Sequence, residues 1–278
     1  MYHKSLAIAA LAATALTALP ATATILTWQA TLAQLNSLAQ VDAGNGDAPI
    51  LPGFVGSTAS GTATATYDTE TMMFSIRVEV AGMEAGIPHL AHIHGSLVDP
   101  MTPGSGALDS TIPTLAQDTD GDGFIEVLEG AATYGPILLD LMSIGDTETI
   151  SFDMTFDLSD PMSFAPVDRF NPDGPRFGIT DLLGDDLMSL QLRHIVVHGL
   201  SVPFEMGNAP GEVDGTSTLL PVCPQDCPGG IPDPFEGTAA LPVLNGEFVL
   251  IRDVPEPAAL GLFGLGLAAL GFARRRRS

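Results

Sequence analysis

The sequence has few cysteines and few basic residues. Two of its 278 residues are cysteine, and 10 are lysine or arginine against 33 aspartates and glutamates. The resulting formal charge of -23 repels phosphate backbones, so nucleic acid is not an expected partner. Three hydrolase patterns are also absent from the sequence, namely a nucleophile elbow, an HExxH helix and a catalytic cysteine–histidine pair. The sequence therefore does not favour an enzyme of these classes.

Short strands and turns dominate what is present. The 30 glycines and 22 prolines indicate many turns, and 45% apolar residues are enough for a globular core. Apolar and polar residues alternate, as is typical of half-buried strands, in residues 24–33, 60–68, 73–80, 149–159 and 246–254, and the apolar segment 193–203 suits a central strand. Such spacing favours an antiparallel β-sandwich or barrel. A helical pattern occurs only around Val127–Ser143 and at 180–192. Within the first, the helix that follows residues 118–129 is expected to run from Ile125 to about Tyr134, where Gly135-Pro136 breaks it.

The first 23 residues have the three parts of a secretory signal peptide. Lys4 supplies the positive start, and the uncharged run Leu6–Leu19 is too short for an ordinary membrane span. Ala21-Thr22-Ala23 is a small-x-small site, which predicts cleavage after Ala23. We therefore expect export across the inner membrane.

Residues 254–278 form a second targeting segment. Pro255-Glu256-Pro257 is followed by an uncharged run over 258–273 and by four arginines, which would hold the tail in the inner membrane with the arginines in the cytoplasm. This tail resembles a PEP-CTERM sorting signal. The resemblance implies that a membrane-embedded exosortase recognises Pro255, Glu256 and Pro257 and removes the helix. Membrane anchoring would then be transient, and the mature protein would reach the cell surface or the extracellular matrix.

Both cysteines lie in a Gly- and Pro-rich segment, residues 207–238, which is predicted to be a long loop. Cys223 and Cys227 are close in the sequence of an exported chain. A local disulfide between them is therefore expected.

The body, residues 24–253, resembles a CHRD (chordin-type) domain. The resemblance rests on a two-strand hairpin followed by "AHIHG", on "RHIVVHGLSVP" about a hundred residues later, and on "ALPVLNGEF" near the end. It implies a secreted β module without known enzymatic activity. We expect a mainly β fold, an antiparallel Greek-key or immunoglobulin-like β-sandwich, with a short helical calcium-loop insertion at 98–148. Extracellular polysaccharide or envelope proteins would be its partners.

Histidines cluster in "HLAHIHG". His92 and His94 would share one face of a strand, and His198 in the later "VVH" could complete a copper or zinc site. His194 could share that face as well. The pattern is similar to copper/zinc superoxide dismutase, although that family's bridging histidine and zinc-ligand loop have no counterpart. Alternatively, these histidines hydrogen-bond to the backbone or to each other and only fix the sheet.

The insertion contains "DTDGDGFIEVLE", residues 118–129, which matches the EF-hand calcium-loop pattern at every required position. Gly123 permits the sharp turn, while Ile125 has no second loop to pair with. The predicted calcium ligands are Asp118, Asp120, Asp122, Phe124, Glu126 and Glu129. The alternative is an acidic surface turn that holds no ion.

Taken together, these features predict an exported, non-enzymatic surface or matrix protein, stabilised by calcium and sorted by exosortase. A metalloprotein similar to copper/zinc superoxide dismutase, using His92, His94 and His198, is the alternative.

Overall fold

The computed structural model describes residues 24–44, 56–200 and 241–255, apart from residues 120, 122, 169 and 170. The predicted signal peptide, the cysteine loop with Cys223 and Cys227, and the tail from Glu256 onward lie outside the described residues. Nothing in the structure therefore bears on the expected disulfide.

The described residues form one antiparallel sheet of nine strands. The strands are β1 (Thr24–Gln34), β2 (Ser60–Asp68), β3 (Met73–Ala81), β4 (His89–Gly95), β5 (Ile137–Gly145), β6 (Thr149–Asp157), β7 (Arg193–His198), β8 (Pro242–Glu247) and β9 (Val249–Pro255). The helices are α1 (Leu38–Gly44), α2 (Val127–Tyr134) and α3 (Ile179–Leu183), with 3-10 turns η1 (Pro161–Ser163) and η2 (Ser189–Leu192).

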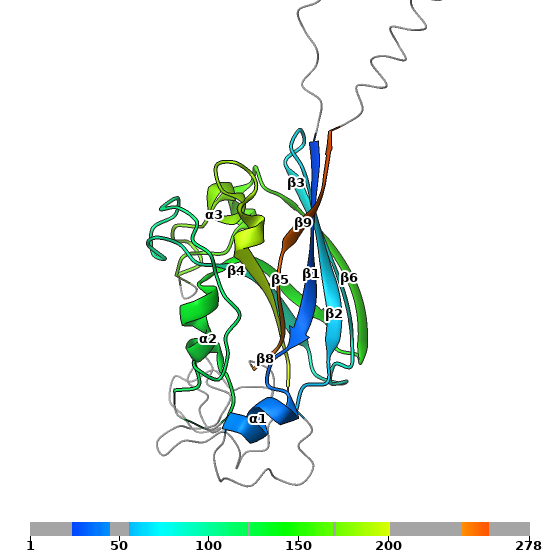
Figure 1. Ribbon diagram of the computed structural model, residues 1–278. Helices are drawn as coiled ribbons and strands as arrows, with labels where there is room; N and C mark the ends of the chain where they lie inside the picture. The colour runs from blue at the N-terminus through cyan, green and yellow to red at the C-terminus, as the bar shows by residue number, and fades with distance from the viewer. Residues whose placement is uncertain are drawn as a thin grey trace, which may run out of the picture.

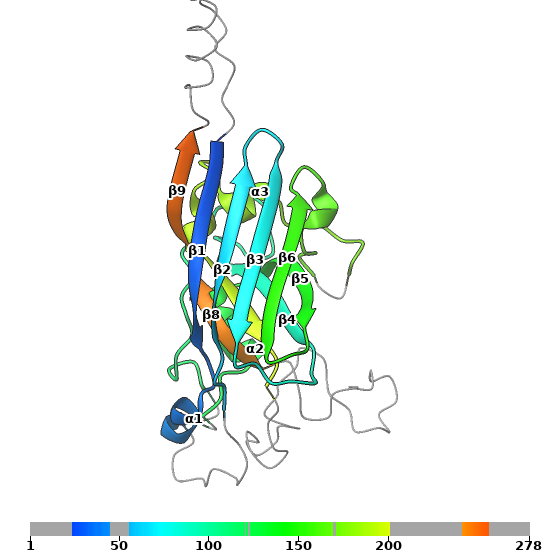
Figure 2. The same cartoon turned by 90° about the vertical axis from the view of Figure 1, so that its right-hand side faces the viewer.

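The sheet curls until it nearly closes into a barrel. Its order is β5-β4-β7-β8-β1-β2-β3-β6, with β9 also paired to β1. β1 joins the two halves, since it pairs with β2 and β9 along most of its length and with β8 at Ala33 and Gln34. Figures 1 and 2 show β1, β2, β3 and β6 on one side, with β4, β5, β7 and β8 folded over behind them.

The core lies between these two halves and follows the alternation in the sequence. Trp28, Phe74 and Val78 are 0% exposed, whereas Arg77, between two buried neighbours, faces solvent. The apolar members of each alternating segment point inward because successive side chains of a strand point to opposite faces. The predicted mainly β, antiparallel fold is confirmed.

The predicted end of the helix at about Tyr134 is confirmed, whereas the helical pattern beyond it, as far as Ser143, is wrong. Gly135 and Pro136 end α2, and Ile137–Gly145 is β5, paired along β4. A short apolar run such as residues 137–141 cannot be assigned to helix or strand by periodicity alone. The predicted insertion 98–148 therefore contains a strand of the sheet, and the segment between β4 and β5 is residues 96–136.

Candidate metal centre

Three histidines meet on the outer face of the sheet. His92 and His94 lie on β4, and His198 is the last residue of β7, which pairs with β4. They point away from the core, which Ala91 and Ile93 enter from the opposite face of β4. One ligand nitrogen of each imidazole lies within 4.8 Å of the other two, and all three residues are buried. The fold thus brings together His92, His94 and His198, the group that the sequence predicts.

In two of these histidines, His94 and His92, one of the two ring nitrogens faces an oxygen atom of the protein. Nδ1 of His94 lies 2.9 Å from the carbonyl oxygen of Gly135, which can only accept, so Nδ1 donates and Nε2 carries the lone pair. Nε2 of His92 lies 3.5 Å from Oδ1 of Asp140, the residue opposite it on β5. A proton on that nitrogen leaves the lone pair of His92 on Nδ1. Metal-binding histidines are usually oriented in this way by a carbonyl or a carboxylate.

The end of α2 lies over this face of the sheet (Figure 1). The rings of Tyr134 and His94 meet edge to face, with centroids 4.6 Å apart. The Tyr134 side chain folds back along its own helix: its hydroxyl donates to the carbonyl of Val127 at 2.9 Å, and a Cβ at Gly130 would collide with its ring. Gly135, with a φ of 75°, then ends the helix and places its carbonyl on His94. α2 therefore fixes the His94 ring from two directions.

His194 shares this face but does not join the three histidines. It lies opposite His94, and its Nδ1 is 2.6 Å from Oγ of Ser110. The Ser110 hydroxyl donates to the carbonyl of Leu192 at 2.7 Å, so it accepts from Nδ1 of His194. The other ring nitrogen, Nε2, lies 3.5 Å from Oε1 of the half-exposed Glu247, a longer contact than the 2.6 Å to Ser110. Burial lowers the pKa of His194 to about 4, and the charge of Asp109 opposes this only in part. His194 is thus neutral at pH 7 and fastens the segment after β4 to β7.

The predicted calcium loop curls around Asp118. Its Oδ1 accepts the N–H of Gly121 at 2.7 Å, and its Oδ2 accepts the N–H of Gly123 at 3.0 Å. At the other end of the loop, Oε1 of Glu129 accepts from the backbone N–H of Thr119 at 2.5 Å and from its hydroxyl at 2.8 Å. These bonds close the loop between its first and last acidic residues. A turn over residues 114–117 precedes it, and α2 follows it.

The other predicted calcium ligands differ in their surroundings. Asp120 and Asp122 lie outside the described residues, whereas Phe124 is in the core and Glu126, the N-cap of α2, is 1% exposed. The carboxyl groups of Glu126 and Glu129 are within hydrogen-bonding reach of each other. Burial raises the pKa of Glu129, but hydrogen bonds from Glu126 and Thr119 outweigh it and lower that pKa overall. Two carboxyl groups in contact favour a shared proton or a cation between them.

Asn36, two residues after the end of β1, holds the end of this loop to the sheet. Its Oδ1 accepts the N–H of Ile125 at 2.8 Å, and its Nδ2 donates to the carbonyls of Ile125 at 3.1 Å and Pro242 at 2.9 Å. The side-chain amide thus hydrogen-bonds both backbone groups of Ile125. The end of the loop is anchored to the sheet through Asn36.

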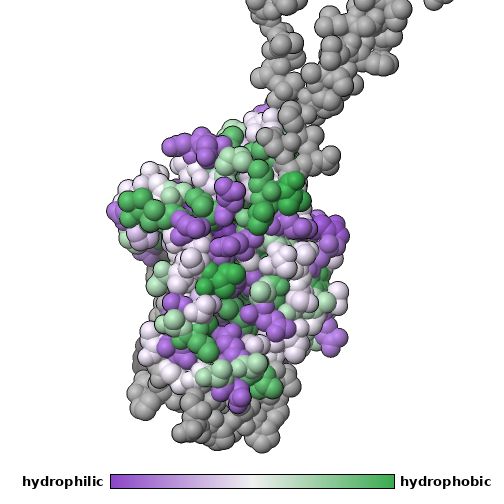
Figure 3. Space-filling model, viewed as in Figure 1, coloured by the Kyte–Doolittle hydropathy of each residue, from purple (hydrophilic) through white to green (hydrophobic). Residues whose placement is uncertain are grey.

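A polar cavity of about 350 Å³ lies between the loop after β4 and α3. Asp181 joins its two sides, because Oδ1 accepts the N–H of Gly104 at 2.7 Å and Oδ2 accepts the N–H of Gly178 at 2.8 Å. The cavity is lined by small and acidic residues, namely Gly104, Gly106, Ala107, Thr180, Gly184, Asp185, Asp186 and Ser189. On the face of the molecule seen in Figure 1, apolar side chains are scattered among polar ones rather than gathered into one patch (Figure 3).

Comparison with known proteins bears on the end of the chain. Residues 253–277 match the PEP-CTERM protein-sorting motif. The tail is a sorting signal. It directs export with processing of the tail by exosortase and localisation to the cell envelope or surface, as the sequence predicts. No curated protein matches the chain. Among the described residues, no helix is long and apolar enough to cross a membrane.

Several residues around the three histidines are not apparent from the sequence. Asp140, Tyr134 and Gly135 lie 40 to 48 residues from the histidines that they contact and belong to no recognisable motif. A signal was available for Asp140 alone, since it is the one charged residue in the apolar run "PILLDLMS". Recognising that run as a strand would have placed a carboxylate within the sheet.

Proposed function

We propose that this is an exported cell-surface protein whose β domain binds a copper or zinc ion through His92, His94 and His198. The proposal rests on the convergence of three imidazole nitrogens to within 4.8 Å of one another. Imidazole is a common ligand of both metals, and two neighbouring strands supply all three rings. The carbonyl of Gly135 and the carboxylate of Asp140 support it further, since each faces the ring nitrogen that would not bind the ion.

We propose a binding role rather than catalysis. A catalytic metal needs an open coordination position for its substrate, whereas these histidines are at most 5% exposed and the Tyr134 ring of α2 packs against His94. An enzyme similar to copper/zinc superoxide dismutase is the second candidate, because the same three histidines would serve it. His194 is bonded to Ser110 and so is not placed to act as that family's bridging ligand.

Elemental analysis of the exported protein, purified without chelator, tests the metal. We expect stoichiometric copper or zinc in the wild type and loss of the metal in His94→Gln and His198→Gln. His194→Gln is the matched control, because it removes a histidine from the same face outside the group and should retain the metal. Wild-type protein that takes up neither metal would refute the proposal. Superoxide turnover by the loaded protein would favour the second candidate.

We further propose that calcium occupies residues 118–129 and stabilises the domain. The contact between the carboxyl groups of Glu126 and Glu129 favours a cation there, and Asp118 begins the loop beside them. A single loop of this kind in an extracellular protein suggests a Kd of roughly 10⁻⁴ to 10⁻³ M, so the ion would be a permanent clamp rather than a signal.

Thermal unfolding at increasing calcium concentrations tests this clamp. The melting temperature should rise at millimolar calcium in the wild type and in Glu79→Gln, which changes an exposed carboxylate on β3. It should stay constant in Glu129→Gln. A wild-type melting temperature that is insensitive to millimolar calcium would remove the calcium proposal and leave the histidine site unaffected.

We also propose that the body is a CHRD-like sandwich that binds extracellular polysaccharide or an envelope protein. The polar cavity beside α3 supports a polysaccharide partner, because its hydroxyl and carboxylate groups can bind sugar hydroxyls. Retention of the wild type on immobilised surface polysaccharide, with reduced retention of Asp186→Ala, is the expected result. Equal retention of the two proteins would exclude this cavity as the binding site.

A further inference from the structure

The sorting signal begins inside the folded domain. β9 pairs with β1 as far as the pair Pro255 and Thr24, and the sorting motif starts at residue 253. Asp253 and Val254 are therefore strand residues, opposite Leu26 and Ile25 respectively. Pro255 is at once the last residue of β9 and the first residue of the Pro-Glu-Pro sequence. No spacer separates the sheet from the motif.

The start of β1 is firmly held. Leu26 and Trp28 are buried in the core, and the backbone N–H of Thr24 donates to Oγ1 of Thr69 in the turn after β2 at 3.0 Å. Thr69 returns a hydrogen bond to the carbonyl of Thr24 at 3.2 Å. β1 is also paired on its other side with β2. The template on which β9 lies is thus part of the stable body of the domain.

β9 itself is held more loosely. It pairs with β1 on one side, and its side chains at Val249 and Ile251 are 60% and 55% exposed. Among the β9 residues whose side chains are described, Val249 to Ile251, Leu250 packs against the core, and the register shifts directly after it. The pairs beyond this shift, from Arg252 to Pro255, lie at the end of the β1–β9 ladder. Such ends open at low free energy compared with the core.

A protease and β1 cannot hold the same backbone groups at the same time. Peptides are commonly bound in extended form through main-chain hydrogen bonds, which are the groups that a strand uses in a sheet. We propose that β1 and the sorting protease compete for residues 252–255, so that the tail is removed when the end of β9 separates from β1. The interaction surface offered to the protease is then the end of the β1–β9 ladder, where the two strands lie side by side (Figures 1 and 2).

An insertion tests the competition in the full chain. Four residues, Gly-Ser-Gly-Ser, placed between Val254 and Pro255 would move the motif up to about 13 Å from the ladder. In a pulse-label experiment in the exosortase-containing host, the half-time of tail removal should shorten several-fold. The same four residues inserted between Met101 and Thr102, in the exposed loop after β4, should leave the half-time unchanged. Cells that lack the protease are the control, because any cleavage that persists in them is not removal of the tail by the exosortase.

Two engineered disulfides provide the opposite test, because they hold β9 to β1 instead of moving the motif away from it. Ile25→Cys with Val254→Cys joins two residues that face each other at the end of the ladder, and Gln29→Cys with Val249→Cys joins the two strands at its beginning. Both variants retain the native Cys223 and Cys227. The first cross-link should block tail removal until the disulfide is reduced. The second cross-link should leave the rate of tail removal unchanged. An unchanged half-time for the insertion, or equal processing of the two cross-linked proteins, would overturn the proposal.

Discussion

Gly95 and Arg193 lie directly opposite each other on β4 and β7, and the Arg193 side chain crosses the space that a Cβ at Gly95 would fill. Nη1 of Arg193 donates to the carbonyls of Ser96 at 3.1 Å and Leu108 at 3.0 Å, and Nη2 donates to that of Asp181 at 2.5 Å. Burial lowers the pKa of Arg193 to about 10, which still leaves it charged. One arginine therefore joins the loop after β4 to α3.

The other end of the same strand pair repeats this arrangement. His89, the first residue of β4, places Nδ1 3.0 Å from the carbonyl of His198 and Nε2 2.8 Å from that of Glu84. A Cβ at Gly199, directly after β7, would collide with the His89 ring. The glycines of "AHIHG" and "VVHG" thus make room for a buried side chain from the opposite strand. His89 and His194 fix the sheet through these contacts, and the hydrogen bond from His94 to the Gly135 carbonyl is of the kind expected if the clustered histidines only fix the sheet.

Replacing Gly95 with Ala should therefore destabilise the domain. The added methyl group has to displace a fully buried arginine, and overpacking of this kind costs about 1 to 3 kcal/mol. Gly178→Ala is the matched control, because a Cβ there meets only Oδ2 of Asp181 at 3.9 Å. Urea unfolding of both variants measures the difference. Equal midpoints for the two would contradict the tight fit of Arg193 over Gly95.

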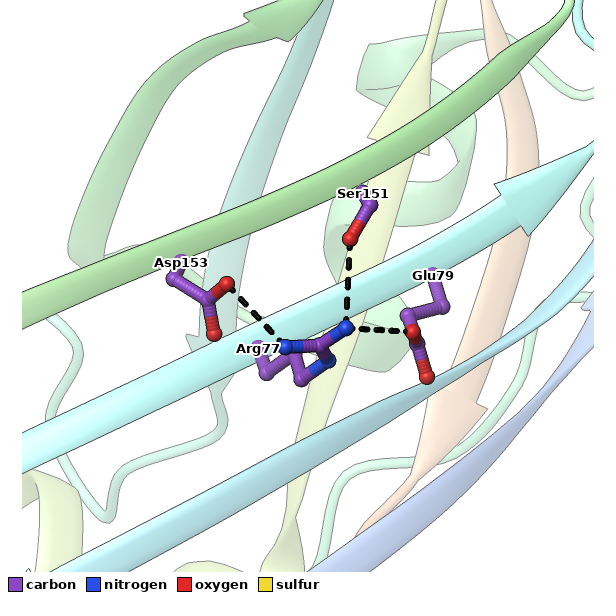
Figure 4. Close-up of polar contacts among 4 residues, drawn as sticks. All are labelled: Arg77, Glu79, Ser151 and Asp153. Atoms are coloured by element: carbon purple, nitrogen blue, oxygen red, sulfur yellow. Dashed lines mark hydrogen bonds and ion pairs between the residues drawn. The ribbon is translucent and has the colours of Figure 1, made fainter.

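Arg193 and Arg77 should respond differently to the same substitution. Figure 4 shows Arg77 on the outer face of β3, where Nη2 bonds Glu79 at 2.7 Å and Ser151 at 3.3 Å, and Nη1 bonds Asp153 at 3.3 Å. Its side chain is 50% exposed, so water and salt screen these pairs. Arg77→Lys should leave the unfolding midpoint nearly unchanged. Arg193→Lys should lower the free energy of unfolding by about 3 kcal/mol, since an ammonium cannot reach the same carbonyls.

The alternation around Trp28 and Phe74 was sufficient to predict their strands, because a half-buried strand leaves its period in the local sequence. β5 was missed because "ILLDL" is buried on both faces and has no such period. The spacing of His92 and His94 predicted a shared face, but only the pairing of β4 with β7 brings His198 to them. Asn36 and Asp140 act across 89 and 48 residues respectively, which local patterns cannot indicate.

Acid should weaken the fold through His194. Its pKa is about 4 in the folded protein against an ordinary value of 6.5, so the unfolded chain binds more protons between these two values. The contribution of neutral His194 to stability is then fully present above pH 6.5 and is lost as the pH falls toward 4. The loss from this group should reach about 2 kcal/mol at pH 5. Denaturant unfolding between pH 7.5 and 5 should show a shallower decline for His194→Gln than for the wild type. Parallel declines would exclude His194 as the cause.

Asn36→Ala should release the end of the loop at residues 118–129. The change removes three buried hydrogen bonds, and the φ of 55° at this position suits Asn better than Ala. A cost of about 3 kcal/mol is expected. Hydrogen exchange at the Ile125 amide should accelerate more than exchange at the core amides. Gln40→Ala, which changes a partly exposed neighbour bonded to the Asn36 backbone, should have a much smaller effect.

Asp140 should strengthen metal binding indirectly, because it contacts His92 rather than the position of the ion. Its Oδ1 lies 3.5 Å from Nε2 of His92, and this carboxylate favours a proton there and a lone pair on Nδ1. Asp140→Asn removes the charge but keeps the shape, so affinity for copper or zinc should fall by about tenfold or more while the melting temperature of the metal-free protein changes little. Asp153→Asn, on the outer face of β6, is the control and should bind as the wild type does. If Asp140→Asn also bound with wild-type affinity, the orientation of His92 would have to come from the packing of the β4–β7 pair alone, and Asp140 would be only a surface carboxylate beside the site.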